Sequence, residues 1–155
     1  MSLSVTVSAT TRSPREHAFD VIVPIELSSV FHGYGPLPAV TGTSDQSGPW
    51  DGVGRTRTVH LSDGSSSAER ITSYERPAAF GYRVGPFTGL FGRVVSHADG
   101  SWVFAELGDS TQIFWTYEFA PRRGTGLLVR AILPLWRRYA DRVLAECVAA
   151  ADQSV

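Results

Sequence analysis

A cluster of charged side chains surrounds the turn dipeptide Asp63-Gly64. The segment before it, GRTRTVHL, holds Arg57 and His60, and the segment after it holds Glu69. Arginine donates to carboxylates, carbonyls and phenolates, and histidine exchanges protons near neutral pH, so these residues could bind a polar group or perform acid–base chemistry. Which of them reaches the interior depends on how the two segments pair.

The apolar residues select between two registers for this hairpin. A two-residue loop and a three-residue loop, the latter with Gly64 in the left-handed conformation, shift the pairing by one residue. Only the three-residue loop places Val59 and Ile71 on one face of the hairpin. The same register places Arg57 directly opposite Glu69 on that face, so the sequence predicts that both point inward.

Three interpretations of the Arg57–Glu69 pair follow. It is a structural ion pair, or it holds Arg57 ready for a carbonyl, phenolate or carboxylate of a ligand, or it is exposed because the register is wrong. His60 is expected to face solvent without a partner. His97 and Asp99 are either an acid–base pair or ordinary surface residues.

Aromatic residues are the second signal. Several of them alternate along strand-like segments or recur on the C-terminal helical pattern, where they line an interior or simply fill the core. Tyr82 and Tyr117 are the better candidates to reach a ligand oxygen, because a buried hydroxyl needs a partner. The candidate ligand-binding residues are Arg57, Glu69, Tyr82, Trp102, Phe104, Trp115, Tyr117, Trp136 and Tyr139.

Composition narrows the function classes. The chain of 155 residues is expected to be one domain, 1–155, and its formal charge of −1 gives no reason to expect nucleic acid as a partner. All 14 basic residues are arginine, which excludes a lysine Schiff base, and the single cysteine, Cys147, excludes an internal disulfide. No metal site and no cofactor are predicted. Without a leader peptide or an apolar run of membrane-spanning length, we expect a cytoplasmic protein with no stable membrane insertion. A homodimer is left open.

The predicted elements must position these side chains. The order is a strand, two short helices, a run of antiparallel strands and one long amphipathic helix, which indicates an α+β fold in which a curved sheet of six or seven strands wraps around the helix. Ser13 is the expected cap of the first helix, and Asp99-Gly100 is expected to be a turn. The strand candidates are 3–11, a weak one near 40–44, 54–61, 66–74, 79–85, roughly 90–97, 102–107 and 111–119. The first helices are predicted over 14–22 and within 25–31, and the last from Thr125 or Pro134 to Ala151.

Three stretches carry a resemblance to a known family: VSATTRSPREHAFDVI, WDGVGRTRTVHLSDG with the following AERITSYERPAAFGYRV, and STQIFWTYEFAP. Together they span nearly the whole chain, which resembles the START-like helix-grip (SRPBCC) superfamily in its polyketide cyclase/dehydrase-type branch. The resemblance implies a hydrophobic pocket between sheet and C-terminal helix. Members include lipid and sterol carriers, hormone receptors and aromatase/cyclases.

Two functions therefore remain open, with a protein-interaction module as a weaker third. The first is binding of a hydrophobic small molecule, such as a lipid, a polyketide or another ring-containing compound. The alternative is a cyclase, aromatase or dehydratase without metal or nucleotide, in which Arg57 polarises a carbonyl, Glu69 acts as base and a tyrosine such as Tyr82 acts as acid. We favour the binder, because no set of residues in the sequence demands catalysis. The conformations of the loops 33–54 and 85–98, and with them the shape of the pocket, are not predicted.

Overall fold

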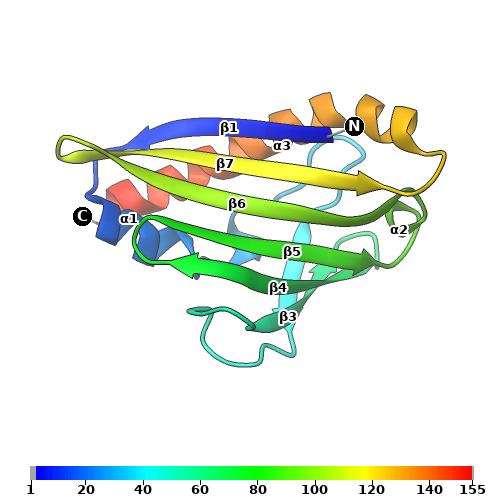
Figure 1. Cartoon of the computed structure of the whole chain (residues 1–155), viewed down its shortest axis with the longest axis horizontal. Coiled ribbons are helices and arrows are strands. Elements are labelled where there is room, and N and C mark those ends of the chain that lie inside the picture. The colour runs from blue at the N-terminus through cyan, green and yellow to red at the C-terminus, as the bar shows by residue number, and fades with distance from the viewer. Residues whose placement is uncertain (1–2, 155) are drawn as a thin grey trace.

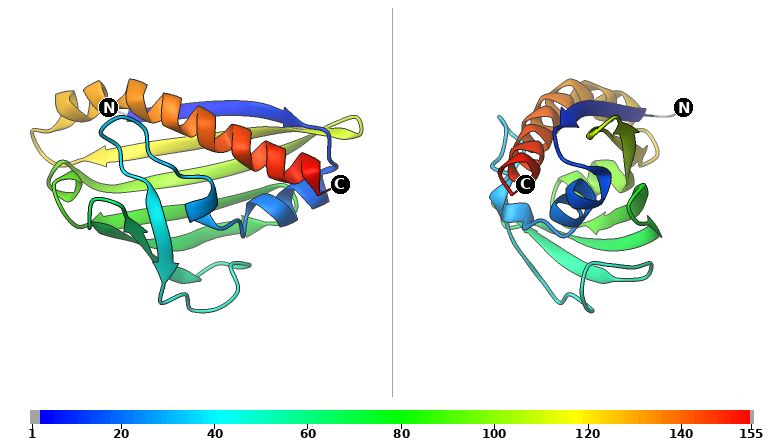
Figure 2. Two further views of the ribbon diagram at one scale, coloured as in Figure 1. Left: turned by 180° about the vertical axis from the view of Figure 1, so that it is seen from behind. Right: turned by 90° about the vertical axis from the view of Figure 1, so that its left-hand side faces the viewer.

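A computed structural model describes residues 3–154. Its strands are β1 (Leu3–Thr11), β2 (Val40–Ser44), β3 (Thr56–Leu61), β4 (Ser66–Glu75), β5 (Ala79–Phe87), β6 (Val95–Leu107) and β7 (Ser110–Pro121). The helices are α1 (Arg15–Ile22), the 3-10 turn η1 (Leu27–Ser29), α2 (Phe91–Val94) and α3 (Gly126–Gln153). The strands form one antiparallel sheet in the order β1-β7-β6-β5-β4-β3-β2, which curves around α3 (Figures 1 and 2). The predicted α+β helix-grip architecture is confirmed.

The hydrophobic core lies between the inner face of the sheet and α3. Strand β1 alternates as expected, with Leu3, Val5 and Val7 buried and the serines and threonines between them exposed. Helix α3 starts at Gly126 and runs through Pro134, so the earlier of its two expected starts is the right one. Its buried face carries Val129, Tyr139, Ala140, Val143, Leu144, Cys147 and Ala151.

The predicted strand over 90–97 is right only for residues 95–97, and the predicted turn at Asp99-Gly100 is wrong. Residues Phe91–Val94 form one helical turn, and β6 continues without interruption through Gly100. A glycine stands there for packing, because a Cβ at this position would lie 2.6 Å from a ring carbon of Tyr82. The glycine that suggested a turn is therefore needed to leave space for the neighbouring ring of Tyr82.

The predictions for the start of the first helix need a smaller correction. Ser13 does not cap α1; its hydroxyl bonds the hydroxyl of Thr11 at 2.8 Å, and Pro14 precedes the first helical residue and accepts from the amide of Ala18. The second predicted helix is reduced to the single turn η1, because the chain leaves helical geometry at Val30. Both short elements nevertheless follow β1 in the expected order.

Candidate ligand-binding site

The hairpin of β3 and β4 has the three-residue loop that the apolar pattern selects. Gly64 has a φ of 87°, and the amide of Leu61 donates to the carbonyl of Ser65 at 2.9 Å. Arg57 is therefore paired with Glu69, and both side chains lie on the inner face of the sheet. The side chains expose only 6% and 8% of their surface.

Arg57 holds Glu69 through one oxygen. The Nε and Nη2 groups of Arg57 donate to Oε1 of Glu69 at 3.0 and 2.6 Å, and neither donates to Oε2. The guanidinium also lies 3.9 Å from the ring centroid of Trp50, a cation–π contact. Burial raises the pKa of Glu69 above its ordinary value, and the charge of Arg57 opposes this rise. The other carboxylate oxygen, Oε2 of Glu69, can thus accept a hydrogen bond from a group on the inner side of the sheet.

A cavity of about 400 Å³ opens beside this pair. Its walls are strands β3, β4, β5 and β7, helices α2 and α3, and the segment 31–40, and most of its lining is aliphatic or aromatic. The lining residues are Leu27, Phe31, Pro36, Leu37, Pro38, Val40, Val59, Leu61, Asp63, Ser65, Ser67, Glu69, Val84, Phe87, Leu90, Phe91, Val94, Tyr117, Phe119, Ile132, Trp136 and Tyr139.

The structure divides the nine predicted site residues into three groups. Four of them line the cavity: Glu69, Tyr117, Trp136 and Tyr139. Glu69 and Tyr117 also border a separate void of about 40 Å³, which is lined in addition by Arg57, Tyr82, Trp102 and Trp115. Phe104 borders neither and packs in the core, with its ring 5.2 Å from that of Phe19. Sequence spacing identified the inner face correctly but not which part of it is hollow.

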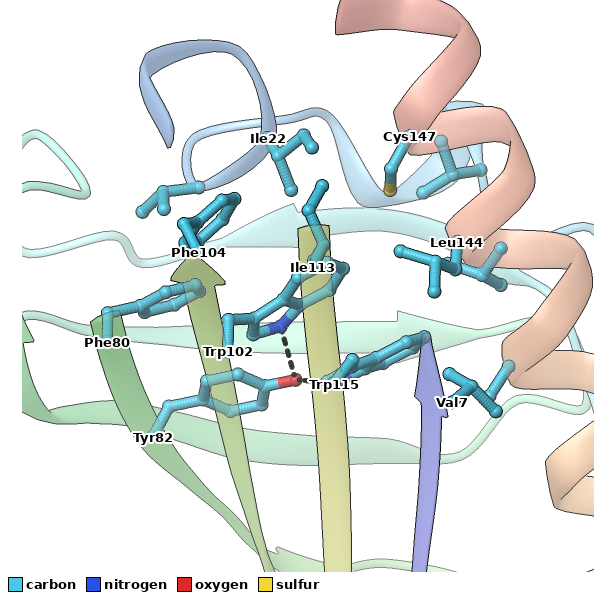
Figure 3. Close-up of a cluster of buried hydrophobic side chains, with 14 of the residues drawn as sticks. Val7, Ile22, Phe80, Tyr82, Trp102, Phe104, Ile113, Trp115, Leu144 and Cys147 are labelled. Atoms are coloured by element: carbon cyan, nitrogen blue, oxygen red, sulfur yellow. Dashed lines mark hydrogen bonds between the residues drawn. The ribbon is translucent and has the colours of Figure 1, made fainter. Parts of the chain in front are cut away.

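Tyr82 sits at the centre of an aromatic hydrogen-bond cluster (Figure 3). Its hydroxyl oxygen accepts from the indole nitrogens of Trp115 at 3.0 Å and Trp102 at 3.4 Å, and the two indole rings stack at 4.7 Å. Burial raises the pKa of Tyr82, and burial together with the neighbouring Tyr82 and Glu69 holds that of Tyr117 well above its ordinary value. Both phenols are therefore neutral at physiological pH, and Tyr117 brings this cluster to the cavity wall.

A strap formed by residues 31–39, which the sequence did not identify as part of the site, closes one side of the cavity. The hydroxyl of Tyr139 accepts from the amide of Gly33 and donates to the carbonyl of Pro38, both at 2.9 Å. In the first half of the strap, the guanidinium carbon of Arg142 lies 4.8 Å from the ring centroid of Tyr34, and His32 contacts Glu146 at 3.1 Å. The only local signal was an apolar residue, Leu37, between two prolines.

The histidine candidates do not contribute to the cavity lining. His60 is exposed as predicted, but it has a partner, the hydroxyl of Ser44 at 2.6 Å, so the expectation that it is unpaired is wrong. His97 lies 3.9 Å from Asp99, whose carboxylate also accepts two bonds from Arg83. Within residues 3–154, no three His, Cys, Asp or Glu side chains gather in a way that could hold a metal ion.

Comparisons with known proteins agree with this geometry. A family model described as polyketide cyclase / dehydrase and lipid transport matches residues 2–152. The ZhuI aromatase/cyclase of a Streptomyces species shares the fold at 15% identity, with a TM-score of 0.76 over 99% of this chain and 95% of its own. Protein TTHA0849 of Thermus thermophilus does so at 12% identity and a TM-score of 0.74, over 98% and 99% of the two chains. Ara h 8.0201 also matches, at 12% identity and 0.67 over 96% and 99%.

A search of curated proteins gives no match. In the part of the chain that the structure describes, no helix is long and apolar enough to cross a membrane. The three structural likenesses establish the fold that surrounds the cavity.

Proposed function

The chain belongs to the polyketide cyclase / dehydrase and lipid transport family, and we propose that it binds a hydrophobic small molecule in the cavity between the sheet and α3. The ligand is expected to be a lipid, a polyketide or another ring-containing compound. The observation that carries the proposal is the cavity itself, whose wall is mostly apolar. A space of about 400 Å³ lies within the range of small-molecule sites.

Two features of the wall support a binding role. Aromatic rings from β7 and α3 pack edge to face and form a preformed surface. The ring centroid of Trp136 lies 4.7 Å from that of Tyr117 and 5.7 Å from that of Tyr139. The strap across the opposite side is held to α3 by polar contacts, and a ligand can enter where these contacts open.

A cavity-filling variant tests the proposal. Ile132→Trp on α3 would occupy the cavity, whereas Leu128→Trp, one turn earlier on an exposed position of the same helix, would not. We expect the wild type and Leu128→Trp to bind a hydrophobic fluorescent probe such as anilinonaphthalene sulfonate with equal affinity, and Ile132→Trp to bind it at least tenfold more weakly. Native mass spectrometry of protein purified from its own host would identify what occupies the cavity. Equal probe binding by all three proteins would refute the assignment.

A second candidate function, a cyclase, aromatase or dehydratase, is supported by the polar groups at the inner end of the cavity. Arg57, Glu69 and Tyr117 are close neighbours there, and the raised pKa of Glu69 is typical of a carboxyl that exchanges protons. In this reading Arg57 polarises a carbonyl, Glu69 removes a proton, and a tyrosine, Tyr82 or Tyr117, donates one. Dehydration of a β-hydroxyketone model substrate by the wild type but not by Glu69→Gln would favour this function over simple binding.

The remaining expectations stay predictions. These are a single domain over 1–155, a cytoplasmic location, the absence of a nucleic-acid partner and of stable membrane insertion, and a possible homodimer. Light scattering of the purified protein would decide the last of them.

A further inference from the structure

The apolar cavity contains a small group of polar side chains on its sheet side. Ser67 and Glu69 alternate on β4 and therefore point to the same side of the sheet, and Tyr117 faces them from β7. Ser67 exposes 4% of its surface, and within residues 3–154 its hydroxyl has no hydrogen-bonding partner. The hydroxyl borders the cavity, so a ligand group that enters the cavity can be its partner.

The immediate neighbours of Ser67 are apolar. Its cross-strand neighbours are Val59 on β3 and Phe87 on β5, and both line the cavity. Neither side chain can form a hydrogen bond, so a ligand is the natural partner for the hydroxyl. Ser67 and Glu69 lie two residues apart on one strand, about 7 Å, so one hydroxylated ring can reach both.

The cavity lining offers acceptors but no free cation. It contains no arginine or histidine among the described residues. The neighbouring Arg57 donates from Nε and Nη2 to Oε1 of Glu69 and stacks on Trp50. The second oxygen of Glu69 is therefore an acceptor that Arg57 does not use. A ligand group at this position has to donate a hydrogen bond.

We propose that Ser67 and Glu69 form a polar subsite that selects a neutral, hydroxylated ring compound and rejects the same ring compound when it carries a carboxylate. The ligand hydroxyl donates to Oε2 of Glu69, and the Ser67 hydroxyl bonds the same group or its neighbour. A carboxylate in that position finds no donor cation, lies beside another carboxylate and loses its hydration. This inference rests on the proposed function, because it requires that the cavity binds a hydrophobic molecule.

Three fluorescent probes with one skeleton test the selectivity: pyrene, 1-hydroxypyrene and pyrene-1-carboxylate, titrated into the whole chain at pH 7. We expect 1-hydroxypyrene to bind about tenfold more tightly than pyrene, as one hydrogen bond to a charged acceptor implies. Pyrene-1-carboxylate is expected to bind at least tenfold more weakly than pyrene. Failure of all three to bind would overturn the proposed function together with the subsite, whereas equal binding of all three would overturn the subsite alone.

Variants assign the selectivity to the two residues. Ser67→Ala leaves the Arg57–Glu69 pair intact and should lower the affinity for 1-hydroxypyrene about threefold without changing that for pyrene. Glu69→Gln should reduce both the preference for the hydroxyl and the discrimination against the carboxylate. Glu75→Gln is the matched control, because it removes a carboxylate from an exposed position of the same strand, β4, outside the cavity lining, and should leave all three affinities unchanged.

Thermal melting of each variant distinguishes lost binding from lost folding. If Glu69→Gln does not fold, Ser67→Ala and its control still decide the question. The subsite is wrong if the hydroxyl preference is undiminished in Ser67→Ala, or if pyrene-1-carboxylate binds the wild type as tightly as 1-hydroxypyrene does.

Discussion

Replacing Glu69 by glutamine should destabilise the protein strongly. Glutamine keeps the shape of the side chain and one acceptor oxygen, but it removes the charge that compensates Arg57 at 2.6 Å in a site where both side chains are more than nine-tenths buried. Leaving one member of such a pair uncompensated costs about 3–5 kcal/mol. For a domain of this size, each kcal/mol lowers the melting temperature by about 2–4 °C, so Glu69→Gln should melt about 6–20 °C below the wild type.

The opposite variant, Arg57→Met, should behave differently with pH. Without the arginine, nothing opposes the effect of burial, and the pKa of Glu69 in the folded state rises further above that of the unfolded chain. An acid with a raised folded-state pKa favours the folded state below the unfolded pKa, and this contribution is lost as the pH rises through the folded pKa. Arg57→Met should therefore be close to wild-type stability near pH 5 and clearly less stable near pH 8.

Thermal unfolding followed by circular dichroism at both pH values measures these effects, and the double variant Arg57→Met/Glu69→Gln supplies the control. Because it leaves no uncompensated charge, it should melt above Glu69→Gln. The electrostatic reasoning is refuted if Glu69→Gln melts within about 2 °C of the wild type at pH 7, or if the penalty of Arg57→Met does not change with pH.

Three further predictions concern the core and its edges. The thiol of Cys147, which exposes 1% of its surface and whose pKa burial raises to about 12, should react slowly with a disulfide reagent at pH 8 and rapidly once denaturant is added; fast native labelling would contradict its placement. Gly100→Ala should cost about 1–3 kcal/mol in denaturant titration, because its methyl group meets the ring of Tyr82, whereas Gly42→Ala, where a Cβ meets nothing within 4 Å, should not. The carboxylate of Asp152 accepts a hydrogen bond from the hydroxyl of Thr11 at the end of β1, which lowers the pKa of Asp152. Its contribution to the free energy of unfolding is therefore present above its unfolded pKa and is lost as the pH falls through the folded pKa. Asp152→Asn should make stability fall less steeply with acid, and an unchanged dependence on pH would contradict this.

Local patterns in the sequence were sufficient for most of the architecture. Strict alternation predicts β1, the change to a period of three and four predicts α3, and the apolar pattern around Gly64 predicts the register that places Arg57 against Glu69. These signals succeed because each depends on residues that are near one another in the chain. The family resemblance extends over the same elements, and the family match over 2–152 confirms it.

Only the tertiary structure decided where the inner face is hollow. The strap over the cavity is held by bonds from Tyr139 to Gly33 and Pro38, residues more than 100 positions away in sequence, and no local pattern encodes such contacts. No local pattern shows the role of Gly100 either. The Asp99-Gly100 dipeptide is typical of a turn, but the glycine lies within β6 and leaves space for the ring of Tyr82 on the neighbouring strand. Strand periodicity determined which side chains point inward in this protein, whereas the packing of distant segments determined which of them face a cavity and which are buried in the core.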